Sequence, residues 1–569
     1  MTSVKTRIVA VFLSIVMCFS IAVPAASAAS DSKLVDDSIV SDVESIFSGL
    51  SDVESMDDFK DNTMKVLYNI LNVVVEALVQ GIAALIPAPK SWIDMDKFDD
   101  SLILKGRDTY ATEAKAGNEW SLGYSSRSLV PEDIESGKYY IGRDLNNRMA
   151  KGVYDDMRIR IAAVDDGSGD GITLIGAIDS LGVNSTDVRS IREGVLKAFA
   201  DKGVKISGIN IMATHSHTAL DTQGVATEFV YKLLTASFVN LFDIKKQSKL
   251  EAADYFKSYF IEQSVIAATE AINNLEPGKM FFSEVDISQY CKDKRGLVSK
   301  EDLPKAAVLK FIPNSGEAST YLMNNTCHPT SFPSSAELVS SDYIYFLDQY
   351  IQEHDNGSHL VMFQGSLGQI SRDNIVGDKT GLDEWEALGC STKETGENFG
   401  RLVLAADFSE ELEPIINEKH EVMWLYPENT ILLLACKINL VNQQVCYDKD
   451  GNKAIASEIG YVEFGHKVGF AMFPGEFYPE VFWGHEIIGD TTWDGSEWPF
   501  ESPHNAISGV SIYCVSLAND ATGYVVTDDN FAFMGHIIGD SIADETLSAG
   551  KHQGSYQIGK FYDLIEEFR

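Results

Sequence analysis

The order of apolar and polar positions from about residue 100 onward alternates between strand-like and helix-like stretches. The runs RIRIAAV (158–164) and ITLIGAI (172–178) flank the turn sequence DDGSGDG, a pattern that predicts two paired strands. Residues 187–202 and 251–275 are helical in pattern. Further strands are expected at 209–214, 307–312, 320–324, 360–363, 431–440, 466–473 and 510–517. No internal repeat is visible. This mixture of strands and helices predicts an α/β fold with mixed β-sheets flanked by helices.

The first 28 residues contain the three parts of a secretory signal peptide. Lys5 and Arg7 supply positive charge, residues 8–23 form an apolar stretch, and the sequence ASA at 26–28 resembles a cleavage site. We therefore exclude residues 1–28 from the fold. We expect an exported protein that is secreted or held at the cell envelope.

The sequence predicts an acidic, short helical N-terminal segment over residues 29–100, ahead of one large domain over residues 101–569. The most apolar part of this segment, residues 66–86, is interrupted by polar residues that share one helix face: Asn69, Asn72, Glu76 and Gln80. A spanning helix needs about 20 nearly uncharged apolar residues. We therefore favour a helix packed against protein, and a helix in peripheral contact with a membrane is the alternative.

The charge balance narrows the choice of partners. The 569 residues include 84 acidic and 46 basic ones, which gives a formal net charge of −38. Such a surface repels nucleic acids at long range, so nucleic acid is excluded as a partner. The hydrophobic fraction of 45% is typical of a globular protein with a large core.

The cysteines are few for a secreted protein. Seven are present, and Cys18 leaves with the signal peptide. Six cysteines in a chain of this length do not make a disulfide scaffold, but an exported protein permits individual disulfides. Cys436 and Cys446 lie on either side of a turn-like stretch, LVNQQV, and are the pair we expect first.

Several apolar runs end in side chains that can bind a metal ion. The run 209–213 leads to His215 and His217, and a second run ends at His328. In an extended strand, residues two apart point to the same side, so both imidazoles of the first pair can reach one point. Glu476 and Tyr524 each follow a turn containing glycine. These residue types suit Zn²⁺ with an open position for water, and hydrogen-bonding loop histidines without a metal are the alternative.

Five short motifs occur in an order that resembles the neutral/alkaline (non-lysosomal) ceramidase family. They are ATHSH, CHPTS, QGSLGQIS, FPGE and LANDATGYVVT, and the resemblance covers roughly residues 105–540. It implies a ceramidase-like catalytic domain and a zinc-dependent amidohydrolase. The implied substrate is ceramide or a related lipid-like N-acyl amide, cleaved at its N-acyl bond by a metal-activated water.

The same resemblance implies roles for individual residues. The implied zinc ligands are His215, His328, Glu476 and Tyr524. His217 corresponds to the second family histidine, which sits beside the zinc. It can hold the tetrahedral oxyanion or pass a proton to the leaving amine. Tyr524 can also stabilise the oxyanion.

Four further positions correspond to family positions around the metal and the substrate. Ser371 matches a serine that contacts the polar head of the substrate, and Arg295 is aligned with a substrate-contacting Asn-Arg pair. His536 stands twelve residues after Tyr524, where the family commonly has a second tyrosine, and is taken as substrate-binding. Asp179 matches a strand-end aspartate and is expected to orient a ligand histidine from the second shell.

The chain also departs from the family pattern. The glycine-rich loop after the histidine pair is replaced by the sequence TALD at 218–221, and the aspartate of the QGD motif is Gln369. These differences concern the substrate more than the metal. They motivate the alternative that the chain is a surface protein with the same fold that binds lipid or glycan without catalysis.

Two other enzyme classes fit parts of the sequence. Ser366 in QGSLG comes close to the nucleophile elbow of serine hydrolases, although Gln364 replaces the first glycine. A His-x-His pair also occurs in metal hydrolases with a TIM barrel. In those enzymes it usually follows the first strand, whereas at least two strands precede it here.

Overall fold

The computed structural model describes residues 79–84, 86–142, 148–226, 251–373, 377–488, 497–531 and 544–569. The predicted signal peptide, most of the acidic N-terminal segment and His536 lie outside these residues. The division into signal, segment and catalytic domain therefore stays a prediction.

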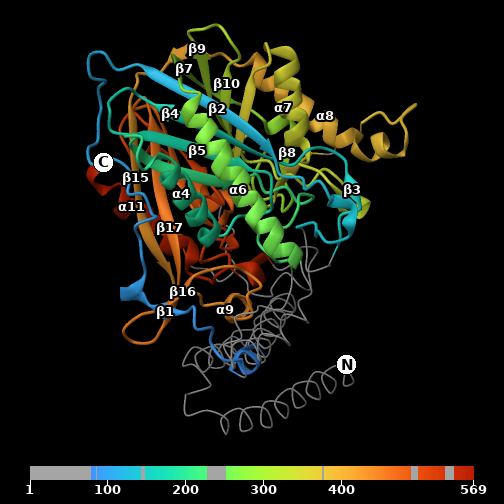
Figure 1. Cartoon of the computed structure of the whole chain (residues 1–569), viewed down its shortest axis with the longest axis vertical. Coiled ribbons are helices and arrows are strands. Elements are labelled where there is room, and N and C mark those ends of the chain that lie inside the picture. The colour runs from blue at the N-terminus through green and yellow to red at the C-terminus, as the bar shows by residue number, and fades with distance from the viewer. Residues whose placement is uncertain are drawn as a thin grey trace, which may run out of the picture.

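The fold is a mixed α/β architecture built on two large mixed sheets (Figure 1). The nine-stranded sheet has the order β12-β10-β9-β7-β2-β4-β5-β6, and β14 pairs with β7. Its strands are β2 (Trp120–Ser128), β4 (Arg158–Asp165), β5 (Ile172–Ile178), β6 (Ile206–Ala213), β7 (Glu276–Val285), β9 (Ala306–Pro313), β10 (Thr320–Asn325), β12 (His359–Gln364) and β14 (Glu410–Glu411).

The six-stranded sheet has the order β1-β16-β17-β18-β20, and β15 pairs with β17. Its strands are β1 (Ile93–Asp94), β15 (Ile416–Leu425), β16 (Val445–Tyr447), β17 (Lys453–Phe464), β18 (Val468–Met472) and β20 (Ser511–Val515). Three two-stranded pairs complete the β structure. They are β3 (Gly152–Val153) with β11 (Leu338–Val339), β8 (Cys291–Asp293) with β13 (Ile370–Arg372), and β19 (Glu476–Phe477) with β21 (Tyr524–Val525).

Helices cover the outer faces of both sheets. Those with described bounds are α4 (Ser185–Phe199), α6 (Glu251–Asn273), α7 (Tyr343–His354), α8 (Glu384–Ala405), α9 (Thr430–Lys437), α10 (Pro479–Trp483) and α11 (Gln553–Leu564). Helix α6 packs on β2, β4 and β5, and α4 packs beside α6 on β6 and β17. Helices α7 and α8 pack over β9, β10 and β12, and α11 packs on β17.

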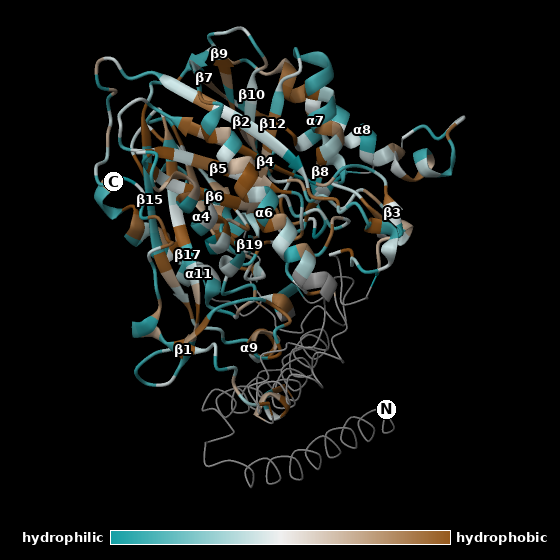
Figure 2. Cartoon of the chain, viewed as in Figure 1, coloured by the Kyte–Doolittle hydropathy of each residue, from teal (hydrophilic) through white to brown (hydrophobic). Residues whose placement is uncertain are grey.

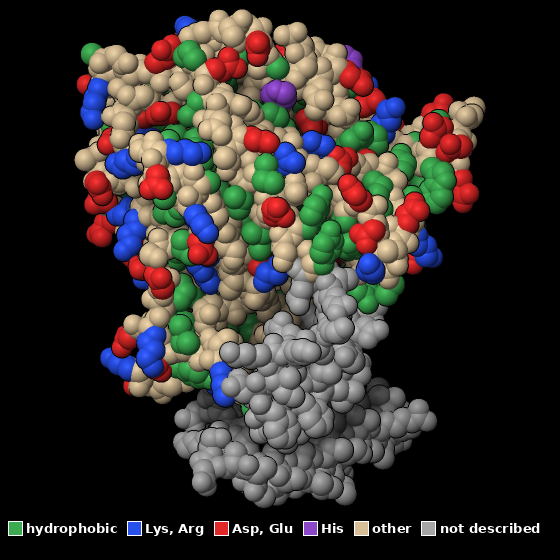
Figure 3. All heavy atoms as spheres, in the orientation of Figure 1, with side chains coloured by type: hydrophobic (Ala, Val, Ile, Leu, Met, Phe, Trp, Pro, Cys, Tyr) green, Lys and Arg blue, Asp and Glu red, His purple; other side chains and the backbone are tan. Residues whose placement is uncertain are grey.

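The core between the sheets explains the apolar pattern of the strands. Along β4, Ile161 and Ala163 face the helices, whereas Ala162 and Val164 face the other sheet, where Phe464 packs in the same cluster. Strands buried on both faces read as continuous apolar runs. Figure 2 shows the apolar residues concentrated on these strands, and Figure 3 shows acidic and basic side chains interspersed on the face in view.

Most of the expected elements are confirmed, with boundaries that move by a few residues. The runs at 158–164 and 172–178 form the antiparallel pair β4–β5. The helices expected at 187–202 and 251–275 are α4 and α6. Strong periodicity and length make these elements the easiest to read from a sequence.

The strand expected at 431–440 is wrong, because this stretch forms α9. The side chain of Asn429 caps the helix by accepting a hydrogen bond from the Ile431 backbone N–H at 2.9 Å. Leu434 and Ile438 are buried in a small cluster with Ile86. Periodicity alone does not separate a short buried helix from a buried strand.

The disulfide expected between Cys436 and Cys446 is also wrong. Both thiols are free and buried, as are Cys291, Cys327 and Cys514, and Cys390 is free and half-buried. Cys436 lies on α9 and Cys446 on β16, so the two do not face each other across a hairpin.

The described end of the N-terminal segment packs against protein. Residues 79–84 are helical, and Val79, Ile82 and Ala83 contact the α9 cluster. Lys437 also donates a hydrogen bond to the Ala83 carbonyl at 2.8 Å. Of the helices in the described part of the chain, none has the length and apolar character to cross a bilayer.

The large sheet curls, so that its two edge strands, β6 and β12, lie close together at their C-terminal ends. The segment after β20 bridges these two ends. Ser516 donates its backbone N–H to the Gln364 carbonyl at the end of β12, and Ala213 at the end of β6 donates to the Leu517 carbonyl. The Gln364 side chain donates to the Thr214 carbonyl at 2.6 Å. The ends of β6, β12 and β20 are therefore brought together from three distant parts of the chain.

Candidate metal centre

His215 stands just beyond the end of β6 with one ring nitrogen fixed by the backbone. Its φ of +63° turns the chain sharply at a non-glycine residue. Its Nδ1 lies 2.7 Å from the Leu181 carbonyl, which can only accept, so Nδ1 carries the proton. The lone pair of the buried Nε2 is therefore available to a metal ion.

Glu476 faces this nitrogen from the first position of β19. Its Oε2 lies 3.2 Å from His215 Nε2, and its Oε1 lies 3.7 Å from His328 Nδ1. Both His215 Nε2 and Glu476 Oε1 are buried without a hydrogen-bond partner. Leaving such atoms unpaired is costly, whereas ligands of one ion are expected to converge in this way.

Close packing between Gly475 and the Val525 side chain helps to position Glu476. A Cβ on Gly475 would lie 2.3 Å from Val525 Cγ2, so the turn before β19 requires glycine. The Glu476 backbone N–H then donates to the Gly523 carbonyl at 2.8 Å, which aligns β19 with β21. The sequence feature that predicted the site, a glutamate after Pro-Gly, is thus a packing requirement.

His217 and His328 complete a group of three imidazoles. Their Nε2 atoms lie 3.0 Å apart, and the ring centroids of the two lie 4.7 and 4.6 Å from that of His215. One ligand nitrogen from each of the three lies within 4.8 Å of the others, so the group can hold a metal ion. His217 therefore belongs to the same group as His215 and His328, the two predicted histidine ligands.

Tyr524 is the register partner of Glu476 in the parallel pair β19–β21, so both side chains leave the same face of this pair. Its ring centroid lies 6.2 Å from that of Tyr478. The strand pairing brings Tyr524 beside the site. Its role as fourth ligand stays a prediction.

Ser371 is brought to the same place by β13. A parallel bridge joins it to His328, whose backbone N–H donates to the Ile370 carbonyl at 2.9 Å. The serine is buried, and its hydroxyl lies 3.4 Å from the Arg372 carbonyl. Its predicted contact with a substrate head group is not tested by these distances.

Arg295 is engaged by carboxylates. It donates to both Glu480 oxygens at 2.6 and 3.0 Å and to Asp293 at 3.2 Å. Burial opposes its charge, but attraction from Glu480 raises the pKa of Arg295. The guanidinium lies 4.4 Å from the ring centroid of Tyr478. Arg295 therefore packs against the ring that lies beside Tyr524. A direct contact with substrate stays a prediction.

Asp179 lies at the end of β5 within a buried ion pair. It accepts from Arg160 at 2.7 Å and from the Ser341 hydroxyl at 2.8 Å. The hydrogen bond that orients His215 comes from the Leu181 carbonyl, two residues further along. Asp179 and Leu181 belong to the same loop after β5, and the predicted orienting role of Asp179 stays a prediction.

Sequence reasoning missed Asp544, which lies in the 3-10 turn η8 (Asp544–Leu547) before α11. The Gln369 amide and the Tyr478 hydroxyl both donate to its carboxylate. Burial raises the pKa of Asp544 to about 6, and the Glu476 charge acts in the same direction against those two hydrogen bonds. The Asp544 carboxylate thus contacts Gln369, the residue that stands in place of the aspartate of the family QGD motif. That replacement was the one available sequence signal.

The structure does not support the two alternative enzyme classes, a serine hydrolase and a TIM-barrel metal hydrolase. The hydroxyl of the buried Ser366 accepts a hydrogen bond from the Trp483 indole at 3.0 Å rather than serving a histidine. TIM-type hydrolases have a parallel eight-stranded barrel, whereas this chain has two mixed sheets. Trp483 itself packs against His504 and Tyr513 as part of the core.

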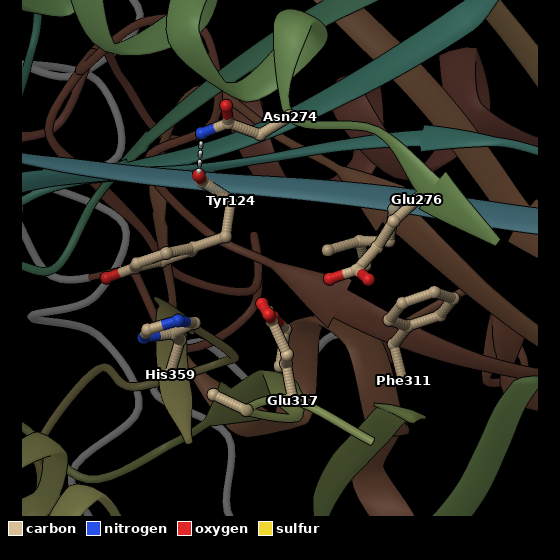
Figure 4. A pocket seen from close by; sticks show the side chains of 9 residues that line it. Tyr124, Asn274, Glu276, Phe311, Glu317 and His359 are labelled. Atoms are coloured by element: carbon tan, nitrogen blue, oxygen red, sulfur yellow. Dashed lines mark hydrogen bonds between the residues drawn. The ribbon is translucent and has the colours of Figure 1, made fainter. Parts of the chain in front are cut away.

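A separate pocket of about 380 Å³ lies where β10 and β12 begin, at the opposite ends of these strands from His328 and Gln364 (Figure 4). Tyr124 and His359 stack along one wall with ring centroids 4.1 Å apart. Figure 4 shows the Glu276 and Glu317 carboxylates reaching into it. None of its lining residues belongs to the metal centre.

Comparison with known proteins identifies the fold. No family model matches the chain, and no curated protein matches it either. Solved structures do match, among them two that each have a TM-score of 0.56 and 15% sequence identity over 79% of this chain. They are the neutral ceramidase from Pseudomonas aeruginosa, covered over 74% of its length, and a ceramidase complexed with C2, covered over 75%. The chain therefore has a neutral-ceramidase-like fold, as the motif order predicted.

Proposed function

We propose that this protein is a zinc-dependent amidohydrolase that cleaves the N-acyl amide bond of ceramide or a related N-acyl lipid. The observation that carries the proposal is the convergence of His215 Nε2 and the Glu476 carboxylate at 3.2 Å, both buried, beside two further histidines. The fold shared with a neutral ceramidase supports an amide as the substrate class.

The donor set fits zinc. Imidazole nitrogens and a carboxylate oxygen are common Zn²⁺ ligands, and two ligands at tetrahedral corners with bonds of about 2.0 Å lie about 3.3 Å apart. The separation between His215 and Glu476 is close to that value. When bound, such an ion polarises the scissile carbonyl and lowers the pKa of a coordinated water.

The chain's own residues divide the remaining tasks. The Leu181 carbonyl fixes the tautomer of His215, so this ligand needs no rearrangement on binding. We assign His217, whose Nε2 lies 3.0 Å from that of His328, the role of giving a proton to the leaving amine. We assign Ser371, which a β-bridge joins to His328, the role of holding the polar head of a substrate.

We also propose where in or outside the cell the protein acts. The signal-like first 28 residues direct the protein to the outside or to the cell envelope, where it meets lipid substrates. A peripheral membrane contact through the N-terminal segment would bring the site close to these lipids. Both points rest on sequence pattern alone.

The test combines metal content with hydrolysis. We expect wild-type protein to retain zinc at the His215–Glu476 site and to release fatty acid from ceramide. Glu476→Gln should lose the zinc of this site and the activity, because the carboxylate is a ligand. His217→Ala should keep most of the zinc but lose turnover at least about 100-fold, in line with loss of a general acid.

Ser366→Ala is the matched control, since this buried serine only accepts a hydrogen bond from Trp483. It should retain zinc and activity, and its inactivation together with an active Glu476→Gln would favour a serine hydrolase. Zinc binding without turnover of any N-acyl amide would favour the alternative, a protein of this fold that binds lipid or glycan.

A further inference from the structure

Asp529 is a buried carboxylate without a hydrogen bond, in the turn that follows β21. Its side chain is 1% exposed, and neither oxygen has a hydrogen-bond partner. Within the described part of the chain, the ionisable side chain next to it is His485, whose Nε2 lies 3.2 Å from Oδ2 and is also without a hydrogen bond. A buried carboxylate left in this state is strongly unfavourable unless a cation binds it.

Further polar atoms beside this pair are buried and unpaired. Thr527 belongs to the same turn, which the Asn530 N–H closes by donating to the Thr527 carbonyl at 3.1 Å. Its hydroxyl has no partner. The indole N–H of Trp498 is unpaired as well, and its ring centroid lies 6.5 Å from that of His485.

Helix α11 supplies a third side to this group. A Cβ on Gly554 would lie 2.6 Å from the Val526 carbonyl and 3.3 Å from Trp498, so this face of α11 packs against the same turn. Gln557 lies one turn further along that face, fully buried, with both amide atoms unpaired. We call the group that contains His485, Trp498, Thr527, Asp529 and Gln557 the second polar cluster.

The second polar cluster repeats the arrangement of the metal centre. In both places an imidazole Nε2 and a carboxylate oxygen lie 3.2 Å apart, buried, and neither nitrogen makes a hydrogen bond. That distance is close to the roughly 3.3 Å between two ligands of one tetrahedral ion. At both places the imidazole nitrogen and at least one carboxylate oxygen are buried without a hydrogen bond.

We propose that the second polar cluster binds a second divalent ion, with His485 Nε2 and Asp529 as ligands and the oxygens of Thr527 and Gln557 beside them. An imidazole ligand favours a zinc-class ion over Ca²⁺ or Mg²⁺, which prefer oxygen alone. The ion is structural, because it joins the segments after α10 and β21 to α11. The proposal is independent of the hydrolytic function, since none of these residues belongs to the metal centre.

Metal stoichiometry tests the proposal on the full chain. Protein loaded with Zn²⁺ and dialysed against metal-free buffer should hold about two ions per chain, and Glu476→Gln and Asp529→Asn about one each. The double variant should hold almost none. Asp528→Asn is the matched control, because the neighbouring carboxylate is bonded to the Ser555 backbone N–H and hydroxyl. It should keep both ions.

Thermal unfolding guards against misfolding of the Asp529 variant. In the Glu476→Gln background, added Zn²⁺ should raise Tm, and in the double variant it should not. The proposal is overturned if Asp529→Asn binds as much zinc as the wild type, or if Ca²⁺ but not Zn²⁺ raises Tm. Loss of zinc in Glu476→Gln alone tests the proposed function, so the two failures are distinguishable.

Discussion

A single backbone carbonyl decides which nitrogen of His215 faces the metal centre. The sequence marked His215 as a ligand but said nothing of its tautomer. Leu181, 34 residues earlier, supplies the acceptor for Nδ1 because β5 and β6 are parallel neighbours whose ends lie together. Non-glycine residues at positive φ also gather here, with +63° at His215 and +60° at Gln369. Such strain is typical of functional sites held by their surroundings.

Gly523 offers a residue-scale test of how tightly the site is packed. Its φ is +89°, and an added Cβ would lie 1.8 Å from the Leu547 carbonyl. We expect Gly523→Ala to cost at least about 2–3 kcal/mol of the free energy of unfolding, from strain and the clash together. Zinc affinity should fall too, because the Gly523 carbonyl anchors Glu476.

Urea unfolding and zinc titration measure both effects, and Gly509→Ala is the matched control. Gly509 has a similar φ of +81° but open space where the Cβ would go. Its substitution should cost only about 1 kcal/mol and leave zinc affinity unchanged. Equal effects of the two substitutions would show that backbone conformation, not close packing, sets the requirement for glycine.

At the scale of elements, the local pattern identified the long helices and most strands but not the short ones. Helix α4 and strands β4 and β5 were predicted because their periodicity extends over many residues. Helix α9 was mistaken for a strand because its apolar run is short and its neighbours are distant in sequence. Its cap, Asn429, is the local feature that marks it as a helix.

The cap of α9 gives an element-scale prediction. Asn429→Ala should lower the free energy of unfolding by about 1–2 kcal/mol, because the Ile431 N–H loses its acceptor. The side chain also donates to the Ser548 carbonyl at 2.7 Å, which adds to the loss. Asn429→Ser restores an acceptor and should recover part of the stability in urea unfolding. No recovery would assign the effect to the Ser548 contact instead.

For the whole molecule, a buried charged network joins the two sheets. Arg192 on α4 donates to both Glu458 oxygens at 2.6 and 2.9 Å. His420 on β15 lies 3.2 Å from Glu458 and 3.1 Å from Glu418. Asn519, in the segment that closes the large sheet, donates to Glu458 at 2.9 Å. The network thereby connects the packing of the sheets with the ends of the strands that carry the site.

This network makes stability depend on pH. Burial alone would lower the pKa of His420, but hydrogen bonds and charge attraction from Glu418 and Glu458 raise it to about 9. Its folded pKa exceeds the ordinary value of 6.5, so its contribution is complete below pH 6.5 and is lost as pH rises toward 9. We expect the urea midpoint to fall over that range.

The matched control is His420→Gln, which cannot ionise. It should be less stable near pH 6 and should lose the part of the pH dependence between 6.5 and 9. At the acidic side, burial opposes ionisation of Glu458, but Arg192 lowers its pKa to about 2, so stability should also fall below pH 4.5. A wild-type urea midpoint that stays constant from pH 6 to 9 would contradict the assigned charge of His420.

The order of apolar and polar residues was enough to predict the fold class and the residue types of the candidate metal centre. These features are local, since apolar runs define strands, and histidine or glutamate side chains follow them after short turns. The tertiary structure decided how the centre is oriented and closed. The Leu181 carbonyl, the contact of Asp544 with Gln369 and the free thiols of Cys436 and Cys446 depend on segments far apart in the chain. Local periodicity carries no record of such contacts, because they form only when the curled sheet brings its edge strands together.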